Sequence, residues 1–363
     1  MNLRHLTLTN FRSYRKESVA LGQGIHFIIG QNGAGKTNFL EAIYMLALAK
    51  SHRGDDQVVI KHGEEFARIV ADVEDHGRLV ELSMVISKEG KSVSVNRVEQ
   101  KRLSDYIGNL RIVSFLPEDT FLVTGSPRDR RVYFDVYLGQ TDHDYIGELA
   151  KYKALLKQRN ELLKMMQDSG KKDDLFLEVI TAQLVDAARP VIQKRERFIA
   201  QINQFLEKEY RHLSGLDESC RVVYQPSTKE ELEEIYRSKL RADLFAQTTT
   251  VGPHRDDYDF VLAGVPAASH ASGGQTRTMI LALDMALCDM MSKGQKDHPI
   301  VLLDDVFSEL DFDKQNRLIR YLKDLHGQVI ITTTSTHDLS PSVLDGVRVY
   351  TVVKGTIKEE KTP

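Results

Sequence analysis

The sequence contains very little cysteine. Only two of its 363 residues are cysteines, Cys220 and Cys288, and neither belongs to a CxxC pattern. This shortage argues against a disulfide framework and against a structural zinc site of the usual cysteine type. It predicts a reduced, intracellular protein.

Long apolar runs are missing as well. No segment approaches the ~18 consecutive apolar residues of a membrane-spanning helix. The opening residues, MNLRHLTLTNFRSYR, carry charges throughout, so we expect no apolar signal segment. Together these absences predict a cytoplasmic protein with no membrane partner.

The chain also lacks a large excess of positive or negative charge, because it has 49 basic and 52 acidic residues and a net charge of −3. Bulk charge therefore does not indicate a nucleic-acid partner, which would need a local patch or a clamp. The chain does have length, and 41% of its residues are hydrophobic. That is enough for two domains or for one large discontinuous domain.

The hydrophobic periodicity predicts an α/β fold with a helical insertion. PIVLLDD and QVIITTT are continuous apolar runs, as in strands buried on both faces of a parallel sheet. Residues 66–98 alternate with period two, which is typical of an antiparallel meander. Residues 143–245 have helical spacing, although Pro190 should kink or break the second of these helices.

A glycine-rich loop lies between a predicted strand and a predicted helix. GQNGAGKT fits the pattern GxxxxGK[ST], in the strand–loop–helix context that the motif requires. Lys36 would reach the β- and γ-phosphate oxygens of a nucleotide, and Thr37 would place its hydroxyl on Mg²⁺. A chance glycine turn is the alternative. The predicted nucleotide-binding residues of this loop are Gly30, Gln31, Asn32, Gly33, Ala34, Gly35, Lys36 and Thr37.

Two adjacent acids follow the apolar strand of PIVLLDD. Asp304 suits coordination of Mg²⁺ through water, and Asp305 suits orienting or deprotonating an attacking water. An ordinary strand-end turn is the alternative interpretation. The acids lie so far from the phosphate loop in sequence that a compact nucleotide-binding fold requires an insertion, which the helical segment supplies.

The stretch ASGGQTR stands directly before a long apolar-periodic segment. Ser272 is a good N-cap, and Gly273 and Gly274 leave backbone N–H groups bare at the start of the helix. Such a helix start favours anions. Taken alone, the tetrapeptide SGGQ is equally consistent with an ordinary helix cap.

The order of these motifs resembles that of the ABC-type ATPases. A phosphate loop, an SGGQ signature, a strand ending in paired acids and SELD at Ser308–Asp311 follow one another as in that family. The resemblance implies an ABC-type P-loop ATPase head made of residues 1–142 and 246–363, with an inserted α-helical arm at 143–245. It also implies two heads face to face, each capping the ATP held by the other. The residues implied to act on the partner's ATP are Ser272, Gly273, Gly274, Gln275 and Asp311.

Further stretches are similar to the SMC-like RecF family of bacterial recombination mediators. They are NFRSY near the start, KSHR, FLPEDTFLVTGSPRDRRVYFD, GPHRDD and LLDDVFSELD. This resemblance implies an ATP-gated homodimer that clamps gapped or single-stranded DNA in recombinational repair and replication recovery. It also implies work with RecO and RecR, RecA loading and SOS induction. Slow hydrolysis is expected, because Asp305 stands where ABC ATPases usually have a glutamate.

Two assignments stay open at this stage. The resemblance suggests that Arg12 approaches the nucleotide, by stacking on adenine or by contacting phosphate, and a solvated turn is the alternative. Many ABC ATPases have a switch histidine after the strand equivalent to QVIITTT. Here Thr333, Thr334 and His337 give no single assignment.

Arginines cluster in SPRDRR, before the predicted arm. Contact with DNA phosphates is one hypothesis for them, and ion pairs with Glu118, Asp119 or Asp135 are the other. The candidates are Arg128, Arg130 and Arg131.

Two other functions remain as alternatives. The ATPase subunit of an ABC transporter shares the nucleotide chemistry, but the helical insertion and the PED…RR block in place of a glutamine loop count against it. A nucleotide-binding scaffold without turnover is the second alternative, in which Asp305 fails as a base.

Overall fold

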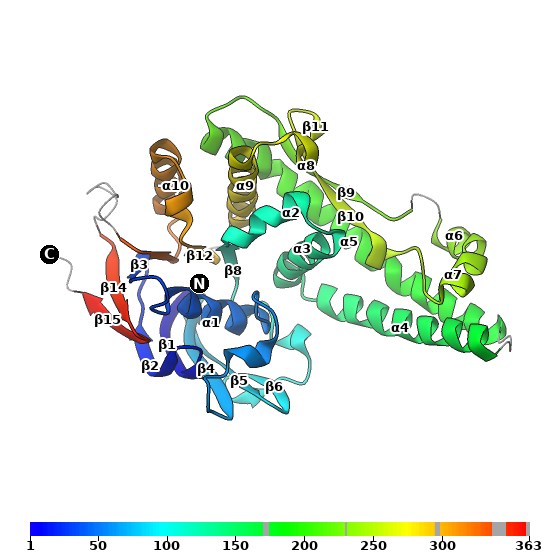
Figure 1. Cartoon of the computed structure of the whole chain (residues 1–363), viewed down its shortest axis with the longest axis horizontal. Helices are drawn as coiled ribbons and strands as arrows, with labels where there is room; N and C mark the ends of the chain where they lie inside the picture. Colours follow the sequence, from blue (N-terminus) through cyan, green and yellow to red (C-terminus); the bar gives the residue numbers. More distant parts are fainter. Residues whose placement is uncertain (170–173, 229–230, 295–297, 336–345, 361–363) are drawn as a thin grey trace. The chain divides into compact units, whose positions relative to one another are not determined.

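The computed structural model describes residues 1–169, 174–228, 231–294, 298–335 and 346–360. The chain forms two compact units (Figure 1). The first comprises Met1–Thr120, Lys208–Asp217 and Arg277–Pro363, and the second comprises Phe121–Glu207 and Glu218–Thr276. None of the described helices combines the length and the apolar character that crossing a bilayer requires.

A mostly parallel sheet lies in the first unit. In chain order its strands are β3 (Ile25–Ile29), β8 (Ile112–Phe115), β12 (Ile300–Asp304), β13 (Val329–Thr333), β14 (Arg348–Val353) and β15 (Thr356–Glu360). The strand order is β15-β14-β3-β13-β12-β8, and only β15 is antiparallel to its neighbour. β12 and β13 are buried along their whole length, because both faces of such a sheet are covered.

An antiparallel sheet also belongs to the first unit. Its strands are β1 (Asn2–Phe11), β2 (Tyr14–Ala20), β4 (Phe66–Asp75), β5 (Arg78–Ser87), β6 (Gly90–Val95) and β7 (Val98–Glu99), in the order β2-β1-β4-β5-β6-β7. The predicted meander at 66–98 is confirmed as β4 to β7. The turn between β4 and β5 is tight, because His76 and Gly77 both take positive φ values, 48° and 74°.

The main helices of the first unit are α1 (Lys36–Leu48), α10 (Phe312–Asp324) and the part of α9 (Gly273–Ser292) that follows Thr276. α1 contacts strands of both sheets, among them β13 and β12 of the parallel sheet and β1 and β4 of the antiparallel one. This position between two sheets explains why α1 is apolar nearly all round. The nucleotide motif therefore lies at the N-terminus of a largely buried helix.

The second unit is mainly helical. Its helices are α2 (Phe121–Thr124), α3 (Pro127–Thr141), α4 (Tyr145–Ser169), most of α5 (Asp174–Ser214), α6 (Leu232–Ser238), α7 (Leu240–Ala246) and α8 (Ala267–His270). It also holds a small sheet of β9 (Cys220–Gln225), β10 (Asp257–Leu262) and β11 (Val265–Pro266). Leu162, Leu163, Met166 and Leu177 form a core between α4 and α5.

Of the two effects predicted for Pro190, a kink or a break, the break is wrong and the kink stays a prediction. α5 continues through this residue for 41 residues in all. Ala188 and Val191, on either side of the proline, are fully buried. Packing of these neighbours outweighs the local loss of one backbone hydrogen bond, so the helix does not end there.

The second unit is larger than the arm expected at residues 143–245. α3 joins it because Phe134 packs against β10, with its ring 4.3 Å from that of Tyr258. Within the expected helical segment, residues 220–225 form β9, which pairs with β10. The sequence-based division at 143 and 245 therefore stays a prediction about an inserted segment, and it differs from the bounds of the compact unit.

Candidate nucleotide-binding site

The glycine-rich loop joins β3 to α1 at the end of the parallel sheet. Gly33 and Gly35 take positive φ values of 77° and 120°, where a side chain is strained. A Cβ on Gly35 would also lie 2.7 Å from the Ser13 hydroxyl oxygen. α1 starts without a side-chain cap and without an acid in its first turn. Its first N–H groups and its dipole therefore favour an anion.

Lys36 folds back over this loop. Its Nζ donates to the carbonyl oxygens of Gly30 at 2.7 Å and Gln31 at 3.2 Å. Burial lowers the pKa of Lys36, and the charges of Asp305 and Asp304 oppose that shift. The ammonium group is therefore held by the loop and feels the charges of both acids.

Asp304 and Thr37 are 267 residues apart in sequence and are in contact in the structure. The Thr37 hydroxyl donates to Asp304 Oδ1 at 3.1 Å, and the Thr332 hydroxyl donates to the same oxygen at 2.6 Å. Among the described residues, no group of three or more His, Cys, Asp and Glu side chains is arranged to hold a metal ion. One carboxylate and one hydroxyl beside a phosphate site are nevertheless the oxygen donors with which proteins bind Mg²⁺ together with nucleotide phosphates.

Asp305 has an unusual backbone conformation. Its φ of 50° and ψ of 26° lie in the left-handed region, which non-glycine residues seldom adopt. Its N–H donates to Thr332, both to the hydroxyl oxygen at 3.0 Å and to the carbonyl oxygen at 3.2 Å. Its Oδ1 is buried and has no hydrogen-bond partner within the described part of the chain. A carboxylate oxygen of this kind is chemically able to accept a hydrogen bond from water.

Arg12 lies beside the loop but is tied to α1. Its Nε and Nη2 donate to the two carboxylate oxygens of Glu41 at 2.9 and 2.8 Å. The Ser51 hydroxyl also donates to Glu41, at 2.8 Å. Burial alone would raise the pKa of Glu41, but the hydrogen bonds from Arg12 and Ser51 hold it below its usual value. The sequence motifs do not identify Glu41, although its partner Ser51 belongs to KSHR.

An open hollow borders the loop on this side. Its lining is basic and polar with two aliphatic side chains, and consists of Arg12, Ser13, Asn38, Arg53, Val58, Ile60 and His62. Ser13 connects the hollow to the loop, because it lies against Gly35 and accepts a hydrogen bond from Asn38 at 3.1 Å. A nucleoside extending from phosphates on the loop would find both cations and apolar contacts here.

The signature residues lie in the second unit, at the start of α9. The Ser272 N–H donates to Gln275 Oε1 at 2.9 Å, and the Gln275 N–H donates to the Ser272 hydroxyl at 3.2 Å. This reciprocal pair is a capping box. A Cβ on Gly273 or Gly274 would meet nothing within 4 Å. The structure therefore presents an exposed helix start in this unit.

Asp311 caps α10 in the first unit. It accepts the Lys314 N–H at 2.9 Å, and this bond is the main reason that its pKa is lowered. Asp311 is otherwise exposed. Of the candidates for the switch position, Thr333 donates its hydroxyl to the Ser335 carbonyl at 3.0 Å. His337 lies outside the described residues.

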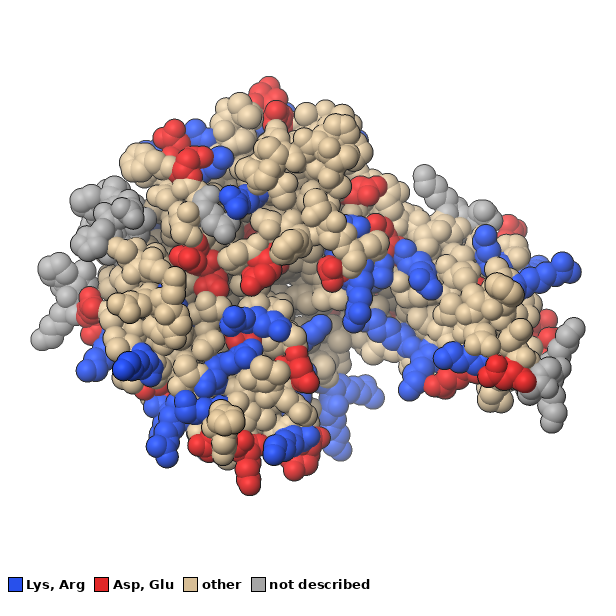
Figure 2. All heavy atoms as spheres, in the orientation of Figure 1, with Lys and Arg blue, Asp and Glu red and all other residues tan. Residues whose placement is uncertain are grey.

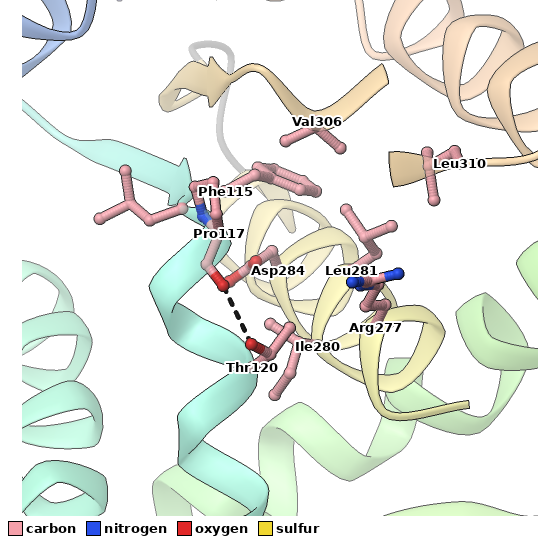
Figure 3. A pocket seen from close by; sticks show the side chains of 10 residues that line it. Phe115, Pro117, Thr120, Arg277, Ile280, Leu281, Asp284, Val306 and Leu310 are labelled. Carbon is pink, nitrogen blue, oxygen red and sulfur yellow. Dashed lines mark hydrogen bonds between the residues drawn. The ribbon is translucent and has the colours of Figure 1, made fainter. Parts of the chain in front are cut away.

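The turn before Asp311 faces α9 across a pocket (Figure 3). A mostly apolar pocket in the first unit separates Val306 and Leu310 from Ile280 and Leu281 of α9. The segment that follows β8 closes the pocket, and there the Thr120 hydroxyl donates to the carbonyl of Pro117 at 3.0 Å. The segments that follow β8 and β12 therefore line the same pocket, together with side chains of α9.

Two of the three arginines of SPRDRR form hydrogen bonds within the second unit. Arg130 forms two bonds with the carboxylate of Asp257, at 2.7 and 2.9 Å. Arg131 donates to the carbonyl of Asp256 at 2.6 Å. Arg128 is exposed. The acids that Arg130 and Arg131 contact belong to GPHRDD and are not the ones that the sequence had offered.

A family model described as RecF/RecN/SMC N terminal domain matches residues 2–358. The chain is 40% identical over 370 residues to the DNA replication and repair protein RecF of Shouchella clausii (strain KSM-K16), covering 99% of each chain. Its identity to the protein of that name in Geobacillus thermodenitrificans (strain NG80-2) is 38% over 369 residues, covering 98% of this chain and 99% of the relative.

Solved structures are also similar. One is the recombination mediator protein RecF-ATPrS in the RecFOR pathway, with a TM-score of 0.88, 28% identity and coverage of 99% of this chain and 98% of the other. Another is the Smc head domain from Pyrococcus furiosus, with a TM-score of 0.59, 19% identity and coverage of 99% and 95%. These likenesses confirm the predicted fold class, an ATPase head of α/β type with a helical insertion.

Proposed function

The chain belongs to the RecF/RecN/SMC family, and from this premise we propose that it is an ATP-dependent DNA-binding protein of recombinational repair and replication recovery. The resemblance indicated by the sequence motifs is confirmed, because the curated relatives are named DNA replication and repair protein RecF. A similar solved structure is RecF-ATP, which supports an ATPase. The transporter alternative finds no support among these relatives.

The hydrogen bond from Thr37 to Asp304 is the observation that carries the ATPase proposal. It joins the phosphate loop to the strand acid at 3.1 Å. In this arrangement Lys36 binds the β- and γ-phosphate oxygens, and the loop N–H groups hold the rest of the triphosphate. Mg²⁺ held by Thr37 and Asp304 would neutralise phosphate charge. Asp305 orients the attacking water and accepts its proton, which yields ADP and phosphate.

ATP joins two copies of the chain in this proposal. The exposed start of α9, with Ser272 and Gly273, supplies N–H groups to the triphosphate held by a partner, and Asp311 lies near the partner's loop. Closure around DNA depends on ATP, because a ligand shifts a conformational equilibrium only through its differential affinity for the two states. Slow hydrolysis, as expected of the short Asp305 side chain, reopens the pair.

The lysines of α4 are the basic surface that we assign to DNA phosphates. Lys153, Lys157, Asn160 and Lys164 are spaced by four, three and four residues, so they share one helix face. The three lysines are exposed, and basic side chains follow α4 on the visible face (Figure 2). A lysine row of this kind matches a phosphate backbone without reading its sequence.

By family resemblance, the DNA would be gapped or single-stranded, and RecO and RecR would assist in loading RecA. The RecFOR pathway belongs to the name of the similar solved structures and supports these partners. A protein working in this pathway would also contribute to SOS induction.

Sizing of the purified protein with and without ATP and Mg²⁺, together with DNA retention, tests the proposal. We expect wild type to dimerise and to retain DNA only with nucleotide. Lys36→Ala should remain monomeric because it binds ATP weakly. Ser272→Arg should bind ATP yet fail to pair, because a bulky cation blocks the exposed helix start. Equal DNA retention by a nucleotide-free monomer would refute the clamp.

A further inference from the structure

Thr332 on β13 contacts both acids at the end of β12. Its hydroxyl donates to Asp304 Oδ1 at 2.6 Å and accepts the N–H of Asp305 at 3.0 Å. The two strands pair in parallel with Asp304 opposite Thr332, so the register itself brings the hydroxyl to this point. The side chain is completely buried, with 0% exposure.

The two hydrogen bonds are chemically compatible. A threonine hydroxyl has one proton to donate and lone pairs to accept with, so it can serve a carboxylate and an amide at the same time. Asp304 Oδ1 is thereby held from two sides, by Thr332 at 2.6 Å and by Thr37 at 3.1 Å. Asp305 is held in its left-handed conformation, because both acceptors of its N–H belong to Thr332.

We propose that Thr332 is a positioning residue for ATP hydrolysis, which fixes the Asp304 carboxylate and the backbone of Asp305 through one hydroxyl. The inference rests on the proposed ATPase function, since it concerns the same two acids. Of the three threonines in QVIITTT, it assigns Thr332 to this site. Thr333, the next residue, directs its hydroxyl to Ser335 instead.

Removal of the hydroxyl should affect turnover more than nucleotide affinity. Asp304 would keep one donor, Thr37, and Asp305 would keep one acceptor, the Thr332 carbonyl. The loop and Lys36, which bind the triphosphate, do not depend on this hydroxyl. Loss of a group that orients a metal-site carboxylate costs about 10–100-fold in metal affinity or activity.

The test compares Thr332→Val, which keeps the branched shape without the hydroxyl, with Thr332→Ser, which keeps the hydroxyl. Binding of a fluorescent ATP analogue, and turnover as a function of ATP and Mg²⁺ concentration, are measured for each. We expect Thr332→Val to lower turnover about 10–100-fold and to require more Mg²⁺, with unchanged analogue affinity. Thr332→Ser should stay within a few-fold of wild type. Thr7→Val, which removes a hydroxyl paired with that of Ser18 in the antiparallel sheet, is the control and should behave as wild type.

Wild-type turnover by Thr332→Val would overturn the proposal, and so would a serine variant as slow as the valine variant. Loss of analogue binding together with turnover would show that Thr332 has a purely structural role and would equally overturn it. Failure of the wild-type protein to bind the analogue is a different result, because it refutes the proposed function itself.

Discussion

Glu41 illustrates how a single buried carboxylate organises the margin of the nucleotide site. It has 0% exposure and lies in α1, five residues after Lys36. Arg12 reaches it from the turn between β1 and β2, and Ser51 reaches it from the segment that follows α1. Arg12 also donates to the Val58 carbonyl at 3.2 Å. Its sequence-based role as a nucleotide contact stays a prediction, and its role in connecting these segments does not depend on nucleotide.

The lowered pKa of Glu41 predicts a pH-dependent contribution to stability. A carboxyl group whose pKa is depressed on folding stabilises the protein above its unfolded pKa of about 4.3, and this contribution is lost as the pH falls through the lower folded value. We expect Glu41→Gln to reduce the free energy of unfolding by about 1–3 kcal/mol near neutral pH, because Arg12 loses its charged partner. The difference from wild type should shrink in acid.

Urea unfolding of both proteins between about pH 7 and pH 3 would measure this effect. Glu65→Gln, a change at an exposed glutamate, is the matched control and should follow wild type throughout. A pH-independent gap between Glu41→Gln and wild type would mean that the carboxylate charge is not the source of the stability.

At the level of single residues, prediction is most direct where the chemistry is local in sequence. The loop residues Gly30 to Thr37 were recognisable because their glycines and Lys36 serve one short turn. Thr332 was not recognisable, because its hydroxyl meets Asp304 only through the pairing of two strands. Three consecutive threonines at the end of an apolar strand gave no basis for choosing among them.

At the scale of the element, α4 makes the DNA hypothesis testable. Replacement of Lys153, Lys157 and Lys164 by glutamate should weaken DNA retention strongly. The salt dependence should fall by roughly 0.7–0.9 in log–log slope for each lysine that contacts a phosphate. Glu161 Oε1 lies 3.9 Å from Lys157 Nζ and offsets part of the lysine's charge. Of the three single changes to glutamate, Lys157→Glu should therefore weaken DNA retention least.

Lys151→Glu is the matched control for that series. Lys151 is exposed on the same helix but points about 160° away from Lys153, since successive residues rotate by about 100°. DNA retention at several salt concentrations distinguishes the two faces. Equal loss from Lys151→Glu and from the three-lysine variant would show a general charge effect and would refute a binding face on α4.

Elements were predictable to the extent that their signals are contiguous. The meander at 66–98 and the long helices of the second unit have periodic patterns, and both are present. β9 was missed because CRVVYQ is short and lies between helical segments, and its partner β10 comes only after residue 256. At Pro190 the local sequence signal predicts a helix end that the structure does not have, because tertiary packing keeps the helix continuous.

At the scale of the whole molecule, ATP should stabilise the protein in two separable ways. Binding to one chain contributes about 2.7 kcal/mol when free ATP is about 100 times its Kd. Pairing adds a contribution that grows with protein concentration, because a dimer forms by mass action. We therefore expect the ATP-induced rise in Tm to increase as wild-type protein is concentrated.

Ser272→Arg separates the two contributions. It should keep a rise in Tm with ATP but lose the dependence on protein concentration, and Lys36→Ala should lose most of both. Thermal unfolding at several protein concentrations, with and without ATP and Mg²⁺, measures this. A concentration-independent rise in wild type would contradict ATP-driven pairing.

The strand order has a consequence for synthesis on the ribosome. β3 is made early, yet its two neighbours, β13 and β14, come at the opposite end of the chain. Roughly 300 residues separate them, which at about 5–20 residues per second leaves β3 without partners for on the order of 15–60 s. The nascent chain therefore carries an apolar, unpaired strand for most of its translation, and chaperones have a long window in which to protect it.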